Sequence, residues 1–171
     1  KAANFLIYMT PRSEKINPIV ISASKFEQRK QDIPQKIISQ NIGDVLANNP
    51  QTSADLLQQS GQVYIQKSQQ GGGSPLIRGF STNRLLITVD GVRMNNAIFR
   101  GGNLQNVISI DPLSIDHTEV ILGPGSVVYG SDAIGGVMNF YTQKPQFSQD
   151  SILFKGNALM RYATANNENT A

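Results

Sequence analysis

The stretch that most constrains the fold is GPGSVVYGSDAIGG, residues 123–136, which holds five glycines in fourteen positions. It lies between two apolar segments, HTEVIL at 117–122 and GGVMNFYTQKP at 135–145. Glycine adopts positive φ angles and permits close backbone approach, so such a stretch suits tight turns that pack against a wall. The pattern therefore predicts a small domain in which a packed turn region joins two strands.

The same glycines do not form a nucleotide-binding motif. A Walker-type loop needs a lysine directly after its last glycine, whereas Ser131 and Asp132 follow Gly130. The dinucleotide pattern G-x-G-x-x-G fails as well, because Val128 stands where the third glycine is required. The glycine-rich stretch is thus expected to be structural.

Short strands and short helices alternate along the middle of the chain. A helix is expected over TSADLLQQ, with Thr52 or Ser53 as its N-cap, because a hydroxyl accepts from the amides of the first turn. Asp90-Gly91 is a turn pair. Strands are expected at 36–39, 62–66, 76–80, 85–89, 117–122 and 135–145. This alternation predicts an α+β domain from about residue 35 to residue 145.

The residues before position 34 have a different character. PIVISAS at 18–24 is apolar and β-branched with a proline at its head, which predicts an extended, unpaired segment. Polar linkers flank it on both sides. The N-terminal part is therefore expected to be poorly anchored to any core.

Charge and side-chain chemistry exclude several function classes. The net charge is +3 and basic residues do not cluster, which argues against nucleic acid as a partner. The chain has no cysteine, and its single histidine, His117, adjoins Asp116 without a catalytic constellation. The carboxylates lack calcium-loop spacing and are expected to pair with arginines. We therefore expect no catalytic residue, no metal site and no cofactor.

The tail alternates regularly. In residues 152–163 one face carries Ile152, Phe154, Gly156, Ala158, Met160 and Tyr162, and the other face is mostly polar. This pattern is typical of one strand of a transmembrane β-barrel. It fits an amphipathic edge strand of a soluble sheet equally well.

Three segments, LIRGF, LLITVDGVRMN and TEVILGPGSVVYGSDAIGGVMNF, closely resemble in order and spacing the plug domain of TonB-dependent outer-membrane receptors. Upstream, NPIVISA resembles the TonB box. The resemblance implies an α+β fold: a small mixed-sheet plug domain with short helices, followed by the start of a transmembrane β-barrel. It divides the chain into an N-terminal extension and linker (1–33, with the box-like segment at 17–23), the plug (34–146), and the first barrel strand with a truncated remainder (147–171).

The resemblance also implies a mechanism. The plug blocks the lumen of its own C-terminal barrel, binds a nutrient at the external face, and opens when TonB pulls on the box by strand addition in the periplasm. The expected TonB-binding residues are Asn17, Pro18, Ile19, Val20, Ile21, Ser22 and Ala23. The expected substrate-binding residues are Gln69, Gln70, Asn95, Asn96, Phe99, Arg100 and Asn103. The expected plug–barrel contacts are Arg78, Arg84, Arg93 and Glu119.

The ligand class stays open at this point. The two loops resemble most the branch that handles haem or haem proteins, although Phe99 and Asn103 stand where that branch often has Tyr and His. A small iron complex or haem is the first expectation, and siderophores, cobalamin and oligosaccharides are the alternatives. The expected location is the outer membrane of a Gram-negative bacterium. The competing hypothesis is a barrel-free, plug-like module that binds a partner in the periplasm or at the cell surface.

Overall fold

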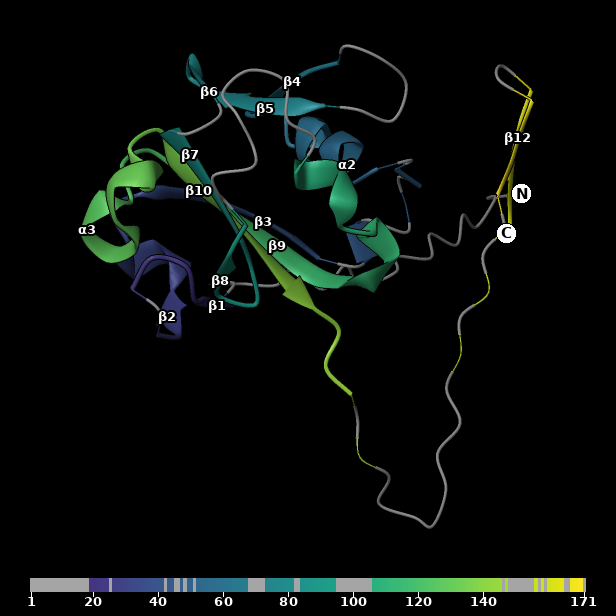
Figure 1. Cartoon of the computed structure of the whole chain (residues 1–171). Coiled ribbons are helices and arrows are strands. Elements are labelled where there is room, and N and C mark those ends of the chain that lie inside the picture. The colour runs from purple at the N-terminus through teal and green to yellow at the C-terminus, as the bar shows by residue number, and fades with distance from the viewer. Residues whose placement is uncertain are drawn as a thin grey trace, which may run out of the picture.

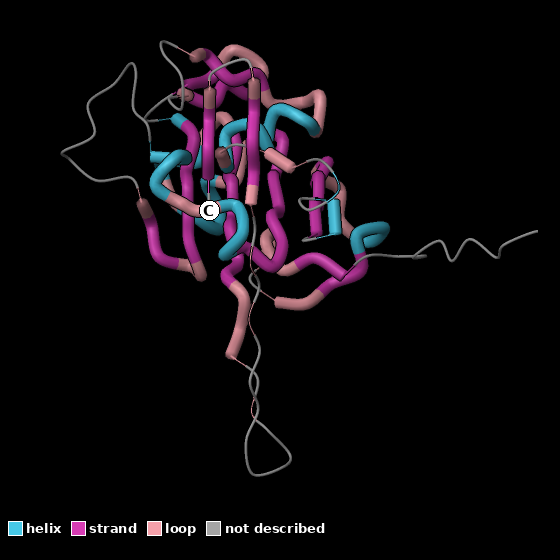
Figure 2. Tube along the Cα trace, turned by 90° about the vertical axis from the view of Figure 1, so that its right-hand side faces the viewer, coloured by secondary structure: helices cyan, strands magenta, loops and turns pink. Residues whose placement is uncertain are grey.

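The computed structural model describes residues 19–24, 26–41, 43–44, 47, 49–50, 52–67, 73–81, 84–94, 106–145, 147, 156, 158, 160–164 and 167–170. Its centre is a five-stranded sheet with the order β3-β9-β10-β7-β8. The strands are β3 (Lys36–Asn41), β9 (Ile115–Leu122), β10 (Gly136–Thr142), β7 (Leu85–Val89) and β8 (Val92–Arg93). Figures 1 and 2 show these strands side by side from two directions.

The sheet is mixed, as the sequence predicted. Strand β9 pairs antiparallel with both β3 and β10, whereas β10 pairs parallel with β7. The β7–β8 hairpin turns at Asp90 and Gly91, whose φ angles are 48° and 83°. Two successive positive φ angles are typical of the tight turns that match strand twist, which confirms the expected turn pair.

One face of the sheet packs against a layer formed by α2 (Ser53–Gln59) and a second sheet of β4 (Tyr64–Gln66), β5 (Ser74–Ile77) and β6 (Phe80–Ser81) (Figure 1). Thr52 is the N-cap of α2 and forms a capping box with Asp55. The strands contribute alternate side chains to this core: Leu85, Ile87, Val120, Leu122, Met138 and Phe140. Helix and strands are thus positioned by burial on one side of a pleated sheet.

The other face carries the N-terminal residues and the helical turns of the glycine-rich stretch, α3 (Ser126–Tyr129) and η5 (Ser131–Ala133) (Figure 1). Strand β1 (Ile19–Val20) pairs antiparallel with β2 (Gln28–Arg29), and the 3-10 turn η1 (Lys30–Asp32) leads into β3. The core on this face contains Val20, Ile33, Ile37, Leu86, Ile121, Ala133 and Val137. The expectation of an unpaired, poorly anchored N-terminal segment is therefore wrong for residues 19–33.

The segment LIRGF is not one strand, as the sequence suggested, but a hairpin. Arg78 and Gly79 take φ angles of 50° and 85° and separate β5 from β6. The 3-10 turns η3 (Asn106–Ser109) and η4 (Pro112–Ser114) precede β9. None of the helices in the described ranges has the length and hydropathy of a membrane-spanning helix.

The tail is described only in part. Residues 148–155, which hold the first four residues of the predicted barrel strand at 152–163, lie outside the described residues, as do residues 157 and 159. In the described remainder β11 (Arg161–Ala163) pairs antiparallel with β12 (Glu168–Thr170). The prediction of a barrel strand at 152–163 remains a prediction.

The glycines of the stretch 123–136 serve the two roles that the sequence suggested. Gly123 and Gly130 have φ angles of 141° and 92°, which non-glycine residues rarely adopt. A Cβ added to Gly136 would lie 2.8 Å from the backbone oxygen of Ile121 and 3.1 Å from Ile77 Cδ1. Gly136 therefore permits the close approach of β10 to β9.

Gly136→Ala is expected to lower the free energy of unfolding by about 1–3 kcal/mol, because the new methyl group overpacks a site bounded by backbone. Urea denaturation of the purified chain measures the change. Gly43→Ala is the matched control, since a Cβ there meets nothing within 4 Å. Equal effects of the two substitutions would contradict the packing role of Gly136.

Candidate functional site

A row of polar side chains crosses the middle of the main sheet on the face that carries the N-terminal segment. Glu119 is the register partner of Ser39 on one side and of Asn139 on the other, and Asn139 is the partner of Thr88. Glu119, Asn139 and Thr88 are 0%, 3% and 1% exposed. A buried polar group needs hydrogen-bond partners, so this row defines a site that a second segment has to complete.

Residues 21 and 22 complete it. The amide of Ser22 donates to Glu119 Oε2 at 2.7 Å, and the amide of Ile21 lies 3.1 Å from both carboxylate oxygens. Among the described residues no lysine or arginine pairs with Glu119. Backbone amides are therefore the donors that compensate this buried carboxylate.

Tyr129 binds the same segment through a carbonyl, whereas Glu119 binds it through amides. The Thr88 hydroxyl donates to Asn139 Oδ1, and this leaves Asn139 Nδ2 to donate to the Tyr129 oxygen at 3.2 Å. The Tyr129 hydroxyl then donates to the carbonyl of Ser22 at 2.7 Å. Asn139 therefore links Thr88 of the sheet to the Tyr129 hydroxyl, which helps to orient Tyr129 towards Ser22.

Burial raises the pKa of Tyr129 above its ordinary value of 10.0; the hydrogen bond from Asn139 lowers it in part, and the charge of Glu119 raises it further. Burial and then the charge of Glu119 also raise the pKa of Tyr141. The Tyr141 ring stacks on His117, with ring centroids 4.4 Å apart. The Tyr129 phenol therefore stays protonated, and able to donate, to a higher pH than an ordinary tyrosine.

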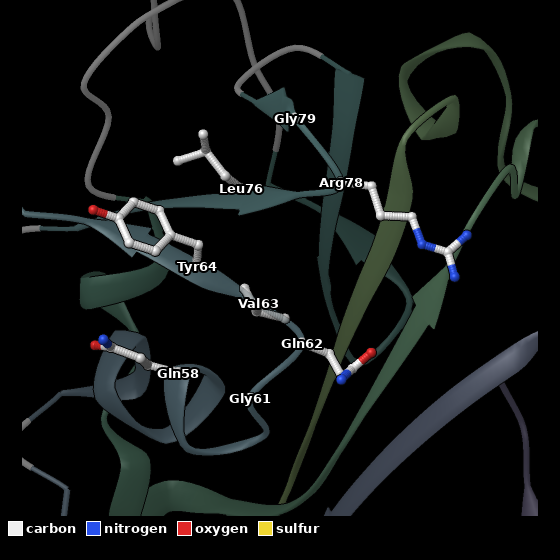
Figure 3. A pocket seen from close by; sticks show the side chains of 8 residues that line it. All are labelled: Gln58, Gly61, Gln62, Val63, Tyr64, Leu76, Arg78 and Gly79. Carbon is white, nitrogen blue, oxygen red and sulfur yellow. The ribbon is translucent and has the colours of Figure 1, made fainter.

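Two cavities adjoin these elements. One of about 470 Å³ lies beside the polar row, and its lining includes Ile21, Tyr129, Asn139, Arg93 and Lys144. The other, of about 420 Å³, is lined by residues of α2, β4 and the β5–β6 hairpin (Figure 3). In Figure 3 the Arg78 side chain extends away from Gln58 and Tyr64.

The structure brings together only part of the predicted site. Ile19 to Ala23 of the predicted TonB-binding segment are described, whereas Asn17 and Pro18 lie outside the described residues. All the predicted substrate-binding residues also lie outside them: Gln69, Gln70, Asn95, Asn96, Phe99, Arg100 and Asn103.

The four predicted plug–barrel contacts divide into two groups. Arg78, Arg84 and Arg93 are exposed, and Arg93 Nη2 lies 3.4 Å from an oxygen of Asp132. Glu119 differs from the expectation, because it is buried inside the chain and its carboxylate binds residues 21 and 22. Its position two residues before Ile121, on the same face of the strand, is the sequence signal for an inward position.

The site binds peptide backbone through Glu119 and Tyr129. In the described part of the chain no group of three or more His, Asp or Glu side chains is placed to hold a metal ion. His117 contacts Asp116 and Tyr141 at the edge of the row. The arrangement therefore supports holding and releasing a segment.

Comparison with known proteins gives one consistent result. Residues 29–137 match the family described as TonB-dependent Receptor Plug Domain. The vitamin B12 transporter BtuB of Vibrio vulnificus (strain CMCP6) is 34% identical over 142 residues, which cover 81% of this chain and 22% of the transporter. These relatives are transporters and receptors, which agrees with the expectation that the chain is not an enzyme.

Solved structures agree in fold. The ferripyoverdine receptor of the outer membrane of Pseudomonas aeruginosa aligns with a TM-score of 0.62 and 19% identity, over 75% of this chain and 17% of the receptor. The alcaligin outer-membrane receptor FauA of Bordetella pertussis aligns with a TM-score of 0.60 and 17% identity, over 75% and 22%. The chain spans about a fifth of the length of these relatives.

Tyr129→Phe is expected to remove a late step from the alkaline titration of tyrosine absorbance at 295 nm. A raised pKa means that the neutral phenol stabilises the fold below pH 10, and that this contribution is lost as the pH rises through the raised value. The variant retains the ring and loses the bond to Ser22. An unchanged titration above pH 10 would contradict the hydrogen-bonded, buried position of Tyr129.

Proposed function

The chain belongs to the family of TonB-dependent receptor plug domains, proteins of the outer membrane of Gram-negative bacteria, and from this premise we propose that it gates a nutrient transporter under the control of TonB. The plug closes the lumen of the receptor's own barrel. TonB pairs with residues 17–23 in the periplasm and pulls on them. The pull displaces the plug and opens a path for the ligand.

The observation that carries this proposal is the attachment of residues 21 and 22 to Glu119. Glu119 lies on β9, an inner strand of the sheet between β3 and β10. Removal of the N-terminal segment by TonB would therefore uncover the centre of the plug, and would not only displace a free linker. Strand addition uses main-chain hydrogen bonds, so Asn17 and Pro18 are compatible with a TonB-binding role.

The exposed arginines of the plug suit reversible polar contacts with the barrel wall. Arg78 and Arg84 are exposed on the plug and available to polar partners on a barrel wall. Exposed ion pairs contribute about 0–1 kcal/mol each. Polar, hydrated contacts of this kind hold a plug in position and still allow it to move.

We assign the ligand to the class of large metal chelates. The named relatives handle vitamin B12 and ferripyoverdine, and a small iron complex or haem belongs to the same class. The loops that contain Gln69, Gln70 and residues 95–103 are the proposed contacts at the external face.

Ile19→Pro in the full receptor is expected to abolish TonB-dependent uptake while ligand binding survives. Proline removes a backbone donor from the segment that TonB pairs with. Ile19→Val is the matched control, because it shortens the side chain and retains the amide. Growth and uptake assays with cyanocobalamin, ferric siderophores and haem as the offered nutrients measure transport, and binding to whole cells measures ligand affinity.

Undiminished uptake in the proline variant would overturn the assignment of residues 17–23 to TonB. Loss of both uptake and binding in the valine control would show that position 19 serves folding instead.

A further inference from the structure

The first turn of α2 lies where the ends of two loops meet the rest of the plug. The loops, 68–72 and 95–105, are those proposed to contact the ligand, and they lie outside the described residues. The described positions that adjoin them are Lys67 and Gly73 for the first loop and residues 106–110 for the second. We refer to these positions as the loop bases. All of them lie against one turn of one helix.

Ser53 attaches the base of the second loop. Its hydroxyl donates to the Val107 carbonyl at 2.6 Å and also contacts the Ile110 carbonyl. Ser53 and Val107 are fully buried. A hydroxyl has a single proton to donate, so the two carbonyls share one donor. Because a buried acceptor that loses its donor costs free energy, Ser53 fixes residues 107–110 to α2.

Asp55 attaches the start of the first loop with the same carboxylate that caps the helix. Its Oδ1 pairs with Lys67 Nζ. Its Oδ2 accepts from the amide of Thr52 at 3.1 Å and from the Thr52 hydroxyl at 3.0 Å. The capping box therefore holds Asp55 in the orientation in which it meets Lys67.

Gly73, at the end of the first loop, packs against the same turn without a side chain in between. A Cβ built on Gly73 would lie 3.2 Å from Ala54 Cβ and 2.5 Å from Ile65 Cγ2. The helix is also fixed to the main sheet, because Gln40 of β3 donates from Nε2 to the Leu56 carbonyl at 3.1 Å. Both loops are thus attached through α2 to the centre of the plug.

We infer that the first turn of α2 positions the two ligand-contacting loops relative to each other, with Ser53 and Asp55 as the positioning residues. This inference rests on the proposed function in taking residues 69–70 and 95–103 as ligand contacts. Ser53 is fully buried, and Asp55 is occupied by Thr52 and Lys67. Both residues therefore act through the loop bases and not by touching the ligand.

Positioning of this kind affects affinity without a direct contact. A chelate large enough to touch both loops needs one arrangement of their bases. If the bases adopt several arrangements, the apparent affinity falls by the fraction of receptors in the arrangement that fits. Looser loop bases and weaker ligand binding are therefore expected together.

Ser53→Ala in the full receptor is expected to speed amide exchange in residues 106–110 about tenfold, because two buried carbonyls lose their shared donor. The affinity for the bound nutrient is expected to fall roughly threefold to tenfold. Ser60→Ala is the matched control: it removes a hydroxyl-to-carbonyl bond of 2.7 Å at the other end of α2, where the acceptor is Leu57. The control leaves exchange at the loop bases and ligand affinity unchanged.

Lys67→Met is expected to speed exchange in residues 67–73 and weaken binding by about twofold to fivefold, since a partly exposed ion pair contributes up to about 1 kcal/mol. Lys67→Arg restores the positive charge and with it both parent values. Lys36→Met is the control, because the Lys36 ammonium group donates to Gln62 Oε1 at 3.0 Å and not to a loop base. Exchange is read by mass spectrometry, and binding is measured with cyanocobalamin, a ferric siderophore and haem.

Unchanged exchange at the loop bases in both Ser53→Ala and Lys67→Met would overturn the inference. Equal effects of Ser53→Ala and Ser60→Ala would also overturn it, because they would show a general loss of helix stability. Faster exchange at the bases with unchanged affinity for a nutrient that the parent binds would overturn the positioning role. If the parent receptor binds none of the three nutrients, the assigned ligand class fails, whereas faster exchange at the loop bases still supports the role of α2.

Discussion

A carboxylate without access to water has to find donors inside the protein, and Glu119 finds them on the backbone of residues 21 and 22. This requirement determines where the N-terminal segment lies. Val20 then enters the core between the sheet and the glycine-rich turn region. Tyr129, at the end of a single helical turn from that region, closes the site over Ser22. The glycines matter here because Gly125 lets the turn region lie close to Val137, and Gly136 lets β10 lie close to β9.

A small number of hydrogen bonds attaches residues 21 and 22 to the plug. Each bond has a modest net contribution, and an unpaired buried carboxylate is costly. Under the proposed function, a TonB strand offers new backbone partners to the segment, and water enters beside Glu119 in its place.

The sequence predicts most of the scaffold and little of the site. The Asp90-Gly91 turn, the Thr52 cap and the apolar strands follow from local chemistry, since turn residues, caps and alternation act within a few positions. The docking of the N-terminal segment is not local, because Ile21 and Glu119 are 98 positions apart. A signal was nevertheless present: Thr88, Glu119 and Asn139 each lie two positions from a buried aliphatic residue of the same strand. The three residues form one row only because of the register between their strands, and the sequence alone does not give that register.

Amide hydrogen exchange of Ile21 and Ser22 in the full receptor, at rest and without TonB, tests the central claim most directly. The claim is that Glu119 holds this segment against the plug. If the claim is correct, both amides exchange on the order of a hundredfold or more slowly than in an unstructured peptide, and the protection is lost in Glu119→Gln. Exchange of both amides at the rate of an unstructured peptide in the resting receptor would contradict it.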